Sequence, residues 1–173
     1  MNVTFRTYES NDRGGCEAVF DGNVPHFFAE SERTGFSEFL DEATDPYWVV
    51  EHDGRIIGCG GYGIWDQGFT ASLCWGMIAS DLHGKRLGEY LLTARLIEIL
   101  NEPAIQSFRV ATSQHTESFF EKYGFIAERR IENGFADGLD KIEMRLSITP
   151  ESKQNLRLKW NSVQGMVKKI GAE

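Results

Sequence analysis

The sequence predicts an α/β fold of the mixed α+β kind, with helices on both faces of a mostly antiparallel sheet of six to seven strands. One observation behind this prediction is that segments with a hydrophobic period of two alternate with segments of helical period. Their order is strand, two helices, three strands, helix, strand, helix and two strands. A second observation is that tight turns join several neighbouring strands, which favours antiparallel pairing. A strand–helix–strand unit over residues 71–111 adds one parallel pair with a right-handed crossover.

The chain begins with a predicted strand, because the side chains of residues 3–8 alternate in character. Two short helices follow, separated by a turn over residues 21–25, and Ser10 is expected to cap the first of them. Their apolar residues recur at helical spacing and are Cys16, Val19 and Phe20, then Phe36, Phe39 and Leu40.

Three strands are expected in the middle of the chain. Residues 47–52 and 55–64 form a hairpin around the dipeptide Asp53-Gly54, a strong turn signal. After a turn at residues 66–68, residues 71–78 form the third strand. The second strand contains four glycines, Gly58, Gly60, Gly61 and Gly63. Glycines inside a strand indicate a bulge or the close approach of another group.

The helix predicted over residues 87–100 is apolar nearly all round, so it must be largely buried. Its polar residues are Glu89, Thr93, Arg95 and Glu98. Pro103 lies just beyond its end, and residues 108–111 form a short strand.

A short helix over residues 116–123 should end at Gly124. The last strand pair is expected at residues 125–131 and 139–148, around a glycine-rich turn at residues 133–138.

Residues 150–173 are predicted as a helical extension of a domain that spans residues 1–149. Five apolar residues of the extension fall on one helix face, namely Leu156, Trp160, Val163, Val167 and Ile170. Two interpretations stay open: this face packs on its own domain, or it contacts a second copy in a homodimer.

Composition and charge exclude several classes of protein. The 173 residues are 41% hydrophobic and 12% aromatic, which suits a globular core, and no apolar run is long enough to span a membrane. The formal net charge of −8 disfavours nonspecific binding to nucleic acid. Residues 150–173 carry a net charge of +3, which leaves −11 on the first 149 residues. An acidic body gives weak support to a cationic substrate such as an amine.

The three cysteines, Cys16, Cys59 and Cys74, are widely spaced. They show neither metal-ligand spacing nor a disulfide framework, so no metal is expected and a reducing cytoplasm is the simplest location. The first residues lack a secretion pattern, which also predicts a cytoplasmic protein.

The segment from Ser80 to Gly88 is the strongest candidate for a ligand site. A strand ends before it and a buried helix begins within it, and the N–H groups that open a helix bind anions. Gly84 and Gly88 let the backbone approach a ligand, while Lys85 and Arg86 add positive charge. Taken alone, the segment also fits a plain strand-to-helix loop with exposed basic residues.

The stretch His83-Gly84-Lys85-Arg86-Leu87-Gly88 resembles the signature of the GNAT acetyltransferase superfamily. That signature reads Gln or Arg, any two residues, Gly, any one residue, and then Gly or Ala. It lies at the start of the helix that follows the fourth strand. A second stretch, Phe119-Phe120-Glu121-Lys122-Tyr123-Gly124-Phe125, is similar to the family's Phe-Tyr-Glu-Lys-x-Gly-Phe segment. The resemblance extends over residues 3–148 with the same order of elements. It implies a GNAT-like fold and a transferase, specifically an N-acetyltransferase.

The resemblance also implies how acetyl-coenzyme A (acetyl-CoA) would bind as co-substrate. The strand ending at Ile78 and the strand around Val110 would splay apart, and the pantetheine arm would enter between them. The diphosphate would lie on the amides of residues 83–88. The expected cofactor-binding residues are Met77, Ile78, Ala79, His83, Gly84, Lys85, Arg86, Leu87, Gly88, Ser113, Phe120 and Lys122. A primary amine of a small molecule or protein would attack the thioester directly in a ternary complex, with backbone N–H groups stabilising the oxyanion.

Two departures from the family pattern bear on activity. His83 stands where the family has Gln or Arg, and Arg86 stands at its central glycine. Arg86 either adds a charge-assisted contact to phosphate or crowds the site. Phe120 replaces a tyrosine that often protonates the leaving thiolate. A thiol is acidic enough that the thiolate can leave without a strong acid.

The sequence does not identify the catalytic residues. The weak candidates are Tyr123 as acid, His115 as base and Trp75 as a wall of the acceptor pocket. Asp66, His83 and Glu51 are further candidate bases, although each fits an ordinary structural role better. The segments 23–28 and 137–140 fall where related enzymes shape the acceptor pocket.

Two alternative functions remain. A GNAT-fold module that binds acyl-CoA without chemistry, as a sensor or interaction module, is kept open by Arg86 and Phe120. A binder of ordinary nucleotides fits poorly, because the sequence has no Gly-x-x-x-x-Gly-Lys-Ser/Thr pattern.

Overall fold

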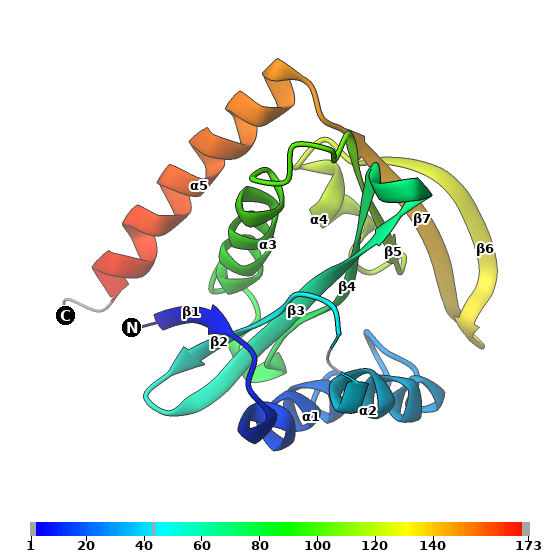
Figure 1. The fold of residues 1–173 in the computed structure, drawn as a ribbon. Helices are drawn as coiled ribbons and strands as arrows, with labels where there is room; N and C mark the ends of the chain where they lie inside the picture. Colours follow the sequence, from blue (N-terminus) through cyan, green and yellow to red (C-terminus); the bar gives the residue numbers. More distant parts are fainter. Residues whose placement is uncertain (1–2, 43, 171–173) are drawn as a thin grey trace.

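The computed structural model describes residues 3–42 and 44–170, and its centre is one seven-stranded sheet (Figure 1). The strand order across the sheet is β1-β2-β3-β4-β5-β7-β6. The strands are β1 (Val3–Thr7), β2 (Tyr47–His52), β3 (Arg55–Trp65), β4 (Thr70–Ile78), β5 (Ser107–Thr112), β6 (Ile126–Ala136) and β7 (Leu139–Ser147). β4 and β5 pair in parallel, and the other neighbouring pairs are antiparallel. The predicted fold class is therefore confirmed.

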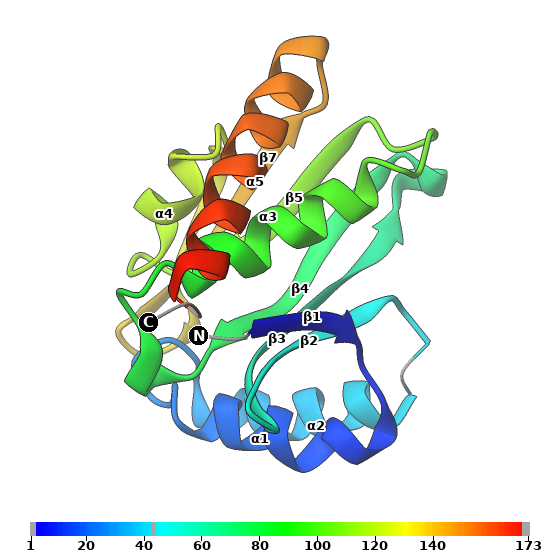
Figure 2. The same cartoon turned by 90° about the vertical axis from the view of Figure 1, so that its left-hand side faces the viewer.

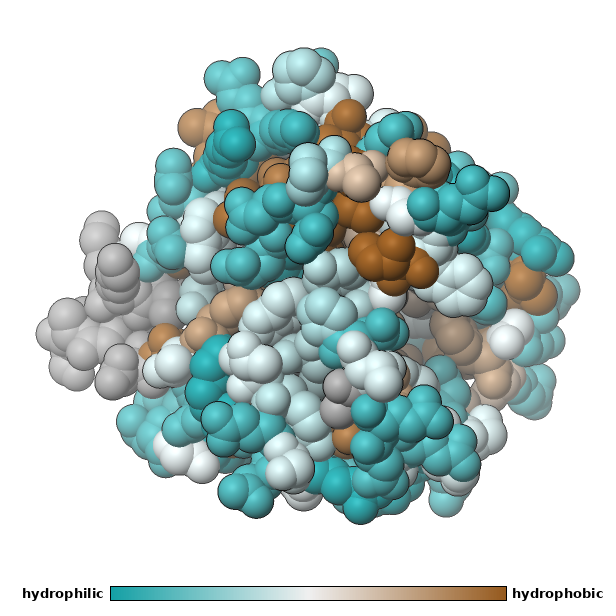
Figure 3. Space-filling view, viewed as in Figure 1, coloured by the Kyte–Doolittle hydropathy of each residue, from teal (hydrophilic) through white to brown (hydrophobic). Residues whose placement is uncertain are grey.

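Helices cover both faces of the sheet (Figures 1 and 2). The two on one face are α1 (Arg13–Asp21) and α2 (Arg33–Glu42). The three on the other are α3 (Leu87–Ile99), α4 (Glu117–Glu121) and α5 (Pro150–Ile170). The outer surface over α1 and α2 is largely hydrophilic, as expected for helices whose inner sides pack on a sheet (Figure 3).

Each face of the sheet has a tightly packed interior. Phe20 of α1 and Phe36 of α2 are fully buried, and their rings stack with centroids 5.3 Å apart. On the other face, Leu92 and Leu96 of α3 join Phe108 of β5 in one buried cluster. This confirms the prediction, from the apolar composition of residues 87–100, that α3 is buried.

The C-terminal helix α5 packs on α3. Leu156 and Val163 are buried, and the rings of Trp160 and Tyr90 stack at 5.5 Å. The side chains of Val167 and Ile170 lie outside the described part of the chain. The helix thus packs on its own domain, while the division at residue 149 and the homodimer stay predictions.

Two local expectations are corrected by the structure. A 3-10 turn at Ser10–Asp12 precedes α1, and the Glu9 N–H donates to Asp12 Oδ2 (2.8 Å), so Ser10 is not the cap of α1. The predicted turn over residues 133–138 is mostly strand, because β6 runs to Ala136 with an irregular register. The side chain of Asn133 bridges this irregularity by accepting from the Gly138 N–H (2.6 Å). No helix in the described residues is long and apolar enough to cross a membrane.

Candidate functional site

The parallel strands β4 and β5 separate near the centre of the sheet. Their pairing begins at Thr70 with Ser107 and ends at Leu73 with Val110, although both strands continue further. Beyond that point, Gly76 of β4 and Ala111 of β5 are exposed to solvent. Central strands of a sheet covered on both faces are normally buried. Their exposure shows that residues are accessible where the two strands diverge, and we call this place the β4–β5 cleft.

A β-bulge shapes the β4 wall of this cleft. Cys74 pairs with Gly61 and Met77 pairs with Cys59, so Trp75 and Gly76 lie opposite a single residue of β3. Trp75 has a φ of 45°, an uncommon backbone conformation for a residue other than glycine. Bulges of this kind re-aim side chains, often next to functional sites. The bulge predicted from the glycines of β3 is present, with its extra residue on β4.

Arg95 of α3 fills the space behind the bulge. Its side chain is 3% exposed, and β-carbons placed on Gly60 and Gly76 would lie 2.8 and 2.5 Å from its guanidinium nitrogens. Its Nη1 donates to the Gly61 carbonyl (3.3 Å) and its Nε to the Leu91 carbonyl (3.4 Å). The sequence marked Arg95 only as a polar residue of an apolar helix. The signal that could have identified this buried contact is an arginine in an apolar helix together with several glycines in the neighbouring strands.

Trp75 lies on the opposite side of the bulge, against aromatic residues of α1, of α2 and of the segment between them. Its ring centroid lies 5.1–6.4 Å from those of Phe20, Phe28, Phe36 and Phe39. The Tyr47 hydroxyl donates to the Trp75 carbonyl (3.0 Å), which holds the unusual backbone in place. Trp75 is half-buried, so one part of the ring is core and another part remains accessible.

The loop after β4 enters α3 without a side-chain cap. Gly84 has a φ of 78° and Arg86 a φ of 62°, both left-handed. Among the described residues, no side chain caps the first turn of α3, which leaves its N–H groups available to an anion. The Arg86 side chain pairs with Glu89 (Nη2 to Oε2, 2.7 Å). Arg86 thus keeps a backbone conformation that favours glycine, although it carries a side chain.

Two backbone groups at the end of β4 already have partners. The Ile78 carbonyl accepts from Asn23 Nδ2 (2.9 Å) and lies 2.9 Å from His83 Nε2. The Ala79 N–H donates to the Ile57 carbonyl (2.8 Å). A ligand that pairs with this strand would therefore use neighbouring groups, such as those of the bulge.

The second predicted motif lies against the start of α3, since a β-carbon on Gly88 would lie 3.8 Å from the ring of Phe119. Ser113 is buried at the end of β5, Phe120 is half-buried in α4, and Lys122 is exposed. Tyr123 is 7% exposed, and burial raises the pKa of its hydroxyl. The Lys159 Nζ lies 4.7 Å from the centroid of its ring, which ties α5 to this region.

Three of the four histidines gather where three loops meet. The rings of His26 and His115 stack with centroids 4.2 Å apart, and Phe27 lies edge-on to His83 at 5.0 Å. The structure thus brings His83 and His115, two predicted bases, into one cluster together with segment 23–28. Sequence reasoning gave His26 no role of its own, because the stacking depends on contacts between distant loops.

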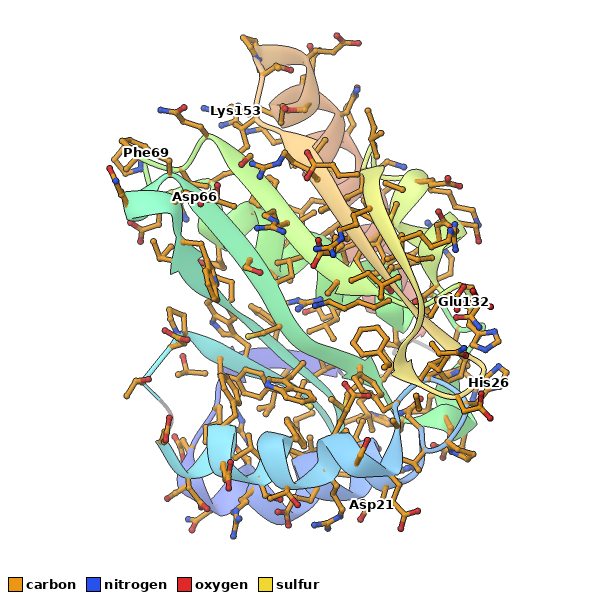
Figure 4. The ribbon with its side chains drawn as sticks, turned by 90° about the vertical axis from the view of Figure 1, so that its right-hand side faces the viewer. Asp21, His26, Asp66, Phe69, Glu132 and Lys153 are labelled. Carbon is orange, nitrogen blue, oxygen red and sulfur yellow. The ribbon has the colours of Figure 1, made fainter. Side chains whose placement is uncertain are left out.

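The other two predicted bases lie elsewhere. Asp66 accepts from the Thr70 hydroxyl (2.9 Å) at the end of the sheet opposite to His26 (Figure 4). Glu51 forms an ion pair with Arg6 (2.7 Å). Within the described residues, no group of three or more His, Cys, Asp or Glu side chains is arranged to hold a metal ion.

A separate cavity of about 480 Å³ opens beside α1 and the β2–β3 turn. Its charged side chains already form ion pairs: Arg6 with Asp12 (2.7 Å) and Arg55 with Asp81 (2.9 Å). Neither Gly76 nor Ala111 lines it, so it is distinct from the β4–β5 cleft.

Comparison with known proteins gives a consistent result. The family described as "Acetyltransferase (GNAT) domain" matches residues 17–148. A putative phosphinothricin N-acetyltransferase is similar in structure, with a TM-score of 0.72 and 19% identity, over 86% of this chain and 99% of that one. A putative GNAT acetyltransferase from Desulfovibrio desulfuricans has a TM-score of 0.69 and 24% identity, over 85% and 99% of the two chains. The putative acetyltransferase yncA from Salmonella typhimurium, solved with acetyl-CoA, has a TM-score of 0.65 and 19% identity, over 86% and 95%. A search of curated protein sequences gives no match.

Proposed function

Because this chain belongs to the GNAT acetyltransferase family, we propose that it transfers the acetyl group of acetyl-CoA to a primary amine of a small molecule or protein. The observation that carries this proposal is the β4–β5 cleft. Pairing of the two strands stops at Leu73 and Val110, and Gly76 and Ala111 are left exposed in the middle of the sheet. A cleft of this kind provides edges of two strands to which an extended ligand can bind.

The residues beside the cleft fit a ligand with a diphosphate and a long polar arm. The uncapped amides of residues 87–89 at the start of α3, next to Gly84 and Lys85, suit the diphosphate. A β-carbon on Gly84 would meet nothing within 4 Å, so the approach to the backbone there is open. On our proposal, the backbone of residues 77–79 and the side chains of Ser113, Phe120 and Lys122 line the path of the arm.

Bound acetyl-CoA would supply an activated acyl carbon held in the cleft. An amine that attacks it forms a carbon–nitrogen bond, while the carbon–sulfur bond breaks and the sulfur keeps the electron pair. The amine must lose a proton, and His83 and His115, which lie in one cluster with Phe27, are the candidate bases. Trp75 would form the wall that the acceptor meets on the α1 and α2 side.

A non-catalytic acyl-CoA-binding module is the alternative. It is supported by the side chains near the cleft, since Phe120 offers no acidic hydrogen and its ring packs on Phe125 (5.5 Å). Burial raises the pKa of the Tyr123 hydroxyl, just after α4, which makes it a weaker proton donor.

One pair of measurements separates these functions. Calorimetric titration with coenzyme A, acetyl-CoA and ATP tests binding, and release of free thiol in the presence of a panel of amines tests transfer. We expect both coenzyme A forms to bind, ATP not to bind, and thiol release to depend on an amine. Binding without release on any amine would favour the module, and absence of coenzyme A binding would overturn the proposal.

A further inference from the structure

Arg95 is a buried cation without an acidic partner. Its guanidinium makes two long hydrogen bonds, to the carbonyls of Leu91 (3.4 Å) and Gly61 (3.3 Å). In the described part of the chain, Nη2 donates no hydrogen bond and no carboxylate pairs with the group. Burying an unpaired charge is costly, so such an arrangement calls for a function or a ligand that compensates it.

The position of the guanidinium relates it to the cleft. A β-carbon on Gly76 would lie 2.5 Å from Arg95 Nη2 and 2.8 Å from Nη1. Gly76 is itself exposed on the wall of the β4–β5 cleft. Because glycine has no side chain, residue 76 itself places no side chain between the guanidinium and the exposed backbone of β4.

The ionisable groups that act on Arg95 include no carboxylate. They are Tyr47 from β2, Cys59 from β3 and Cys74 from β4. Burial raises the pKa of Cys74 to about 12 and the pKa of Tyr47 well above its ordinary value, so both are uncharged near neutral pH. Asp45 also acts on Cys74, but it forms no ion pair with Arg95. Burial lowers the pKa of Arg95, yet an arginine stays protonated in proteins.

We propose that the guanidinium of Arg95 stabilises the coenzyme A sulfur as a thiolate when the acetyl group is transferred in the β4–β5 cleft. This inference rests on the proposed function. In the transfer, the amine nitrogen bonds to the acetyl carbon, the carbon–sulfur bond breaks, and the sulfur keeps the electron pair. The proton that the amine loses passes to a base, for which His83 and His115 are the candidates, and from there to solvent, while the sulfur leaves as the thiolate.

A fixed positive charge suits this role. A cation that is already in place stabilises developing negative charge without reorganisation of the site. The same charge accounts for a cleft in which the phenyl ring of Phe120 offers no proton. It also gives a reason for the two glycines, Gly60 and Gly76, that make room for the guanidinium.

The test measures the ionisation of coenzyme A bound to the protein. The thiolate is followed by its ultraviolet absorbance while the complex is titrated from about pH 6 to about pH 10, a range that brackets a free thiol. The complex with desulfo-coenzyme A serves as the blank. In the wild type we expect a midpoint at least about 1 unit below that of free coenzyme A, as for an opposite charge nearby.

Two variants separate charge from packing. Arg95→Met removes the charge and fills similar space, and its midpoint should return to that of free coenzyme A or rise above it. Arg95→Lys keeps a charge and should keep most of the shift. With acetyl-CoA, Arg95→Met should lower kcat by about 100-fold, as for removal of one group that stabilises developing charge, while KM for acetyl-CoA stays nearly unchanged.

Each outcome has a definite meaning. A wild-type protein that binds coenzyme A with an unshifted or raised midpoint overturns this inference and leaves the proposed function standing. A protein that binds no coenzyme A in calorimetry overturns both. If Arg95→Met does not fold, the wild-type midpoint and that of Arg95→Lys still decide the question.

Discussion

The guanidinium of Arg95 occupies the space in which a side chain at residue 76 would stand, since a β-carbon on Gly76 would lie 2.5 Å from Nη2. The contact joins α3 to the bulge of β4, and it ties the shape of the cleft wall to one buried residue of the helix. Gly60 meets the same guanidinium from β3, with 2.8 Å to Nη1. Two strands and one helix are thus fitted to each other at a single point.

Gly76→Ala should destabilise the protein. The added methyl group must displace the end of an arginine side chain that is itself buried, and overpacking of this kind costs about 1–3 kcal/mol. Urea denaturation measures the loss. Combining the change with Arg95→Met should reduce the cost of the alanine, because the group that it meets is then gone.

Gly35→Ala is the matched control. A β-carbon there meets nothing within 4 Å, and the residue lies inside α2. Alanine is the better helix former, so the control should gain roughly 0.5–1 kcal/mol. Equal losses in the two variants would show that Gly76 is not specifically fitted to Arg95.

Gly84→Glu should abolish coenzyme A binding while the protein stays folded. Gly84 has a φ of 78° and open space around its β-carbon, so the change adds modest strain but places a negative charge in the loop that should hold the diphosphate. Calorimetry measures affinity and thermal unfolding measures stability. Gly84→Asn is the control, since asparagine tolerates a left-handed backbone and carries no charge. Wild-type affinity in the glutamate variant would contradict the assignment of this loop.

Tyr123→Phe should leave kcat within about threefold of the wild type, which is less than the effect of removing a general acid. Burial raises the pKa of the hydroxyl, and a weaker acid donates a proton to a thiolate less readily. Initial rates with acetyl-CoA across a pH series provide the measurement. A fall of about 100-fold at unchanged stability would instead identify Tyr123 as the acid.

The element order was predictable because its signals are local. Alternation in β1, the Asp53-Gly54 turn between β2 and β3 and the apolar stretch of α3 are each contained in a few residues. The burial of Arg95 against the sheet was not predictable, because it depends on glycines of β3 and β4 that meet α3 only in the folded chain. The stacking of His26 on His115 likewise depends on loops far apart in the sequence.

The effect of Arg86 on the loop was predictable only in part. The sequence revealed that an arginine stands at the family's central glycine, but it left two outcomes open for the site. The structure shows that the backbone keeps a glycine-like φ of 62° and that the side chain pairs with Glu89. Local geometry of this kind follows from the surrounding loop, which a motif alone does not describe.

Asp12→Asn should destabilise the protein at neutral pH and have little effect in acid. The Asp12 carboxylate accepts from Arg6 Nη1 (2.7 Å) and Nη2 (2.8 Å), and these hydrogen bonds are the main cause that lowers its pKa. A group with a lowered pKa contributes stability above its unfolded pKa, near 3.8, and this contribution is lost as pH falls through the folded value. The variant should therefore cost about 1–3 kcal/mol at neutral pH, since the lost bonds are charge-assisted.

The pH series decides between this carboxylate and surface charge in general. Denaturation of the wild type and of Asp12→Asn at several pH values should give curves that converge below an unfolded pKa near 3.8. Asp41→Asn is the control, because its pair with Arg13 (3.1 Å) is exposed and such pairs contribute little. A constant difference between wild type and Asp12→Asn at all pH values would mean that the loss is steric, and that ionisation of Asp12 does not stabilise the fold.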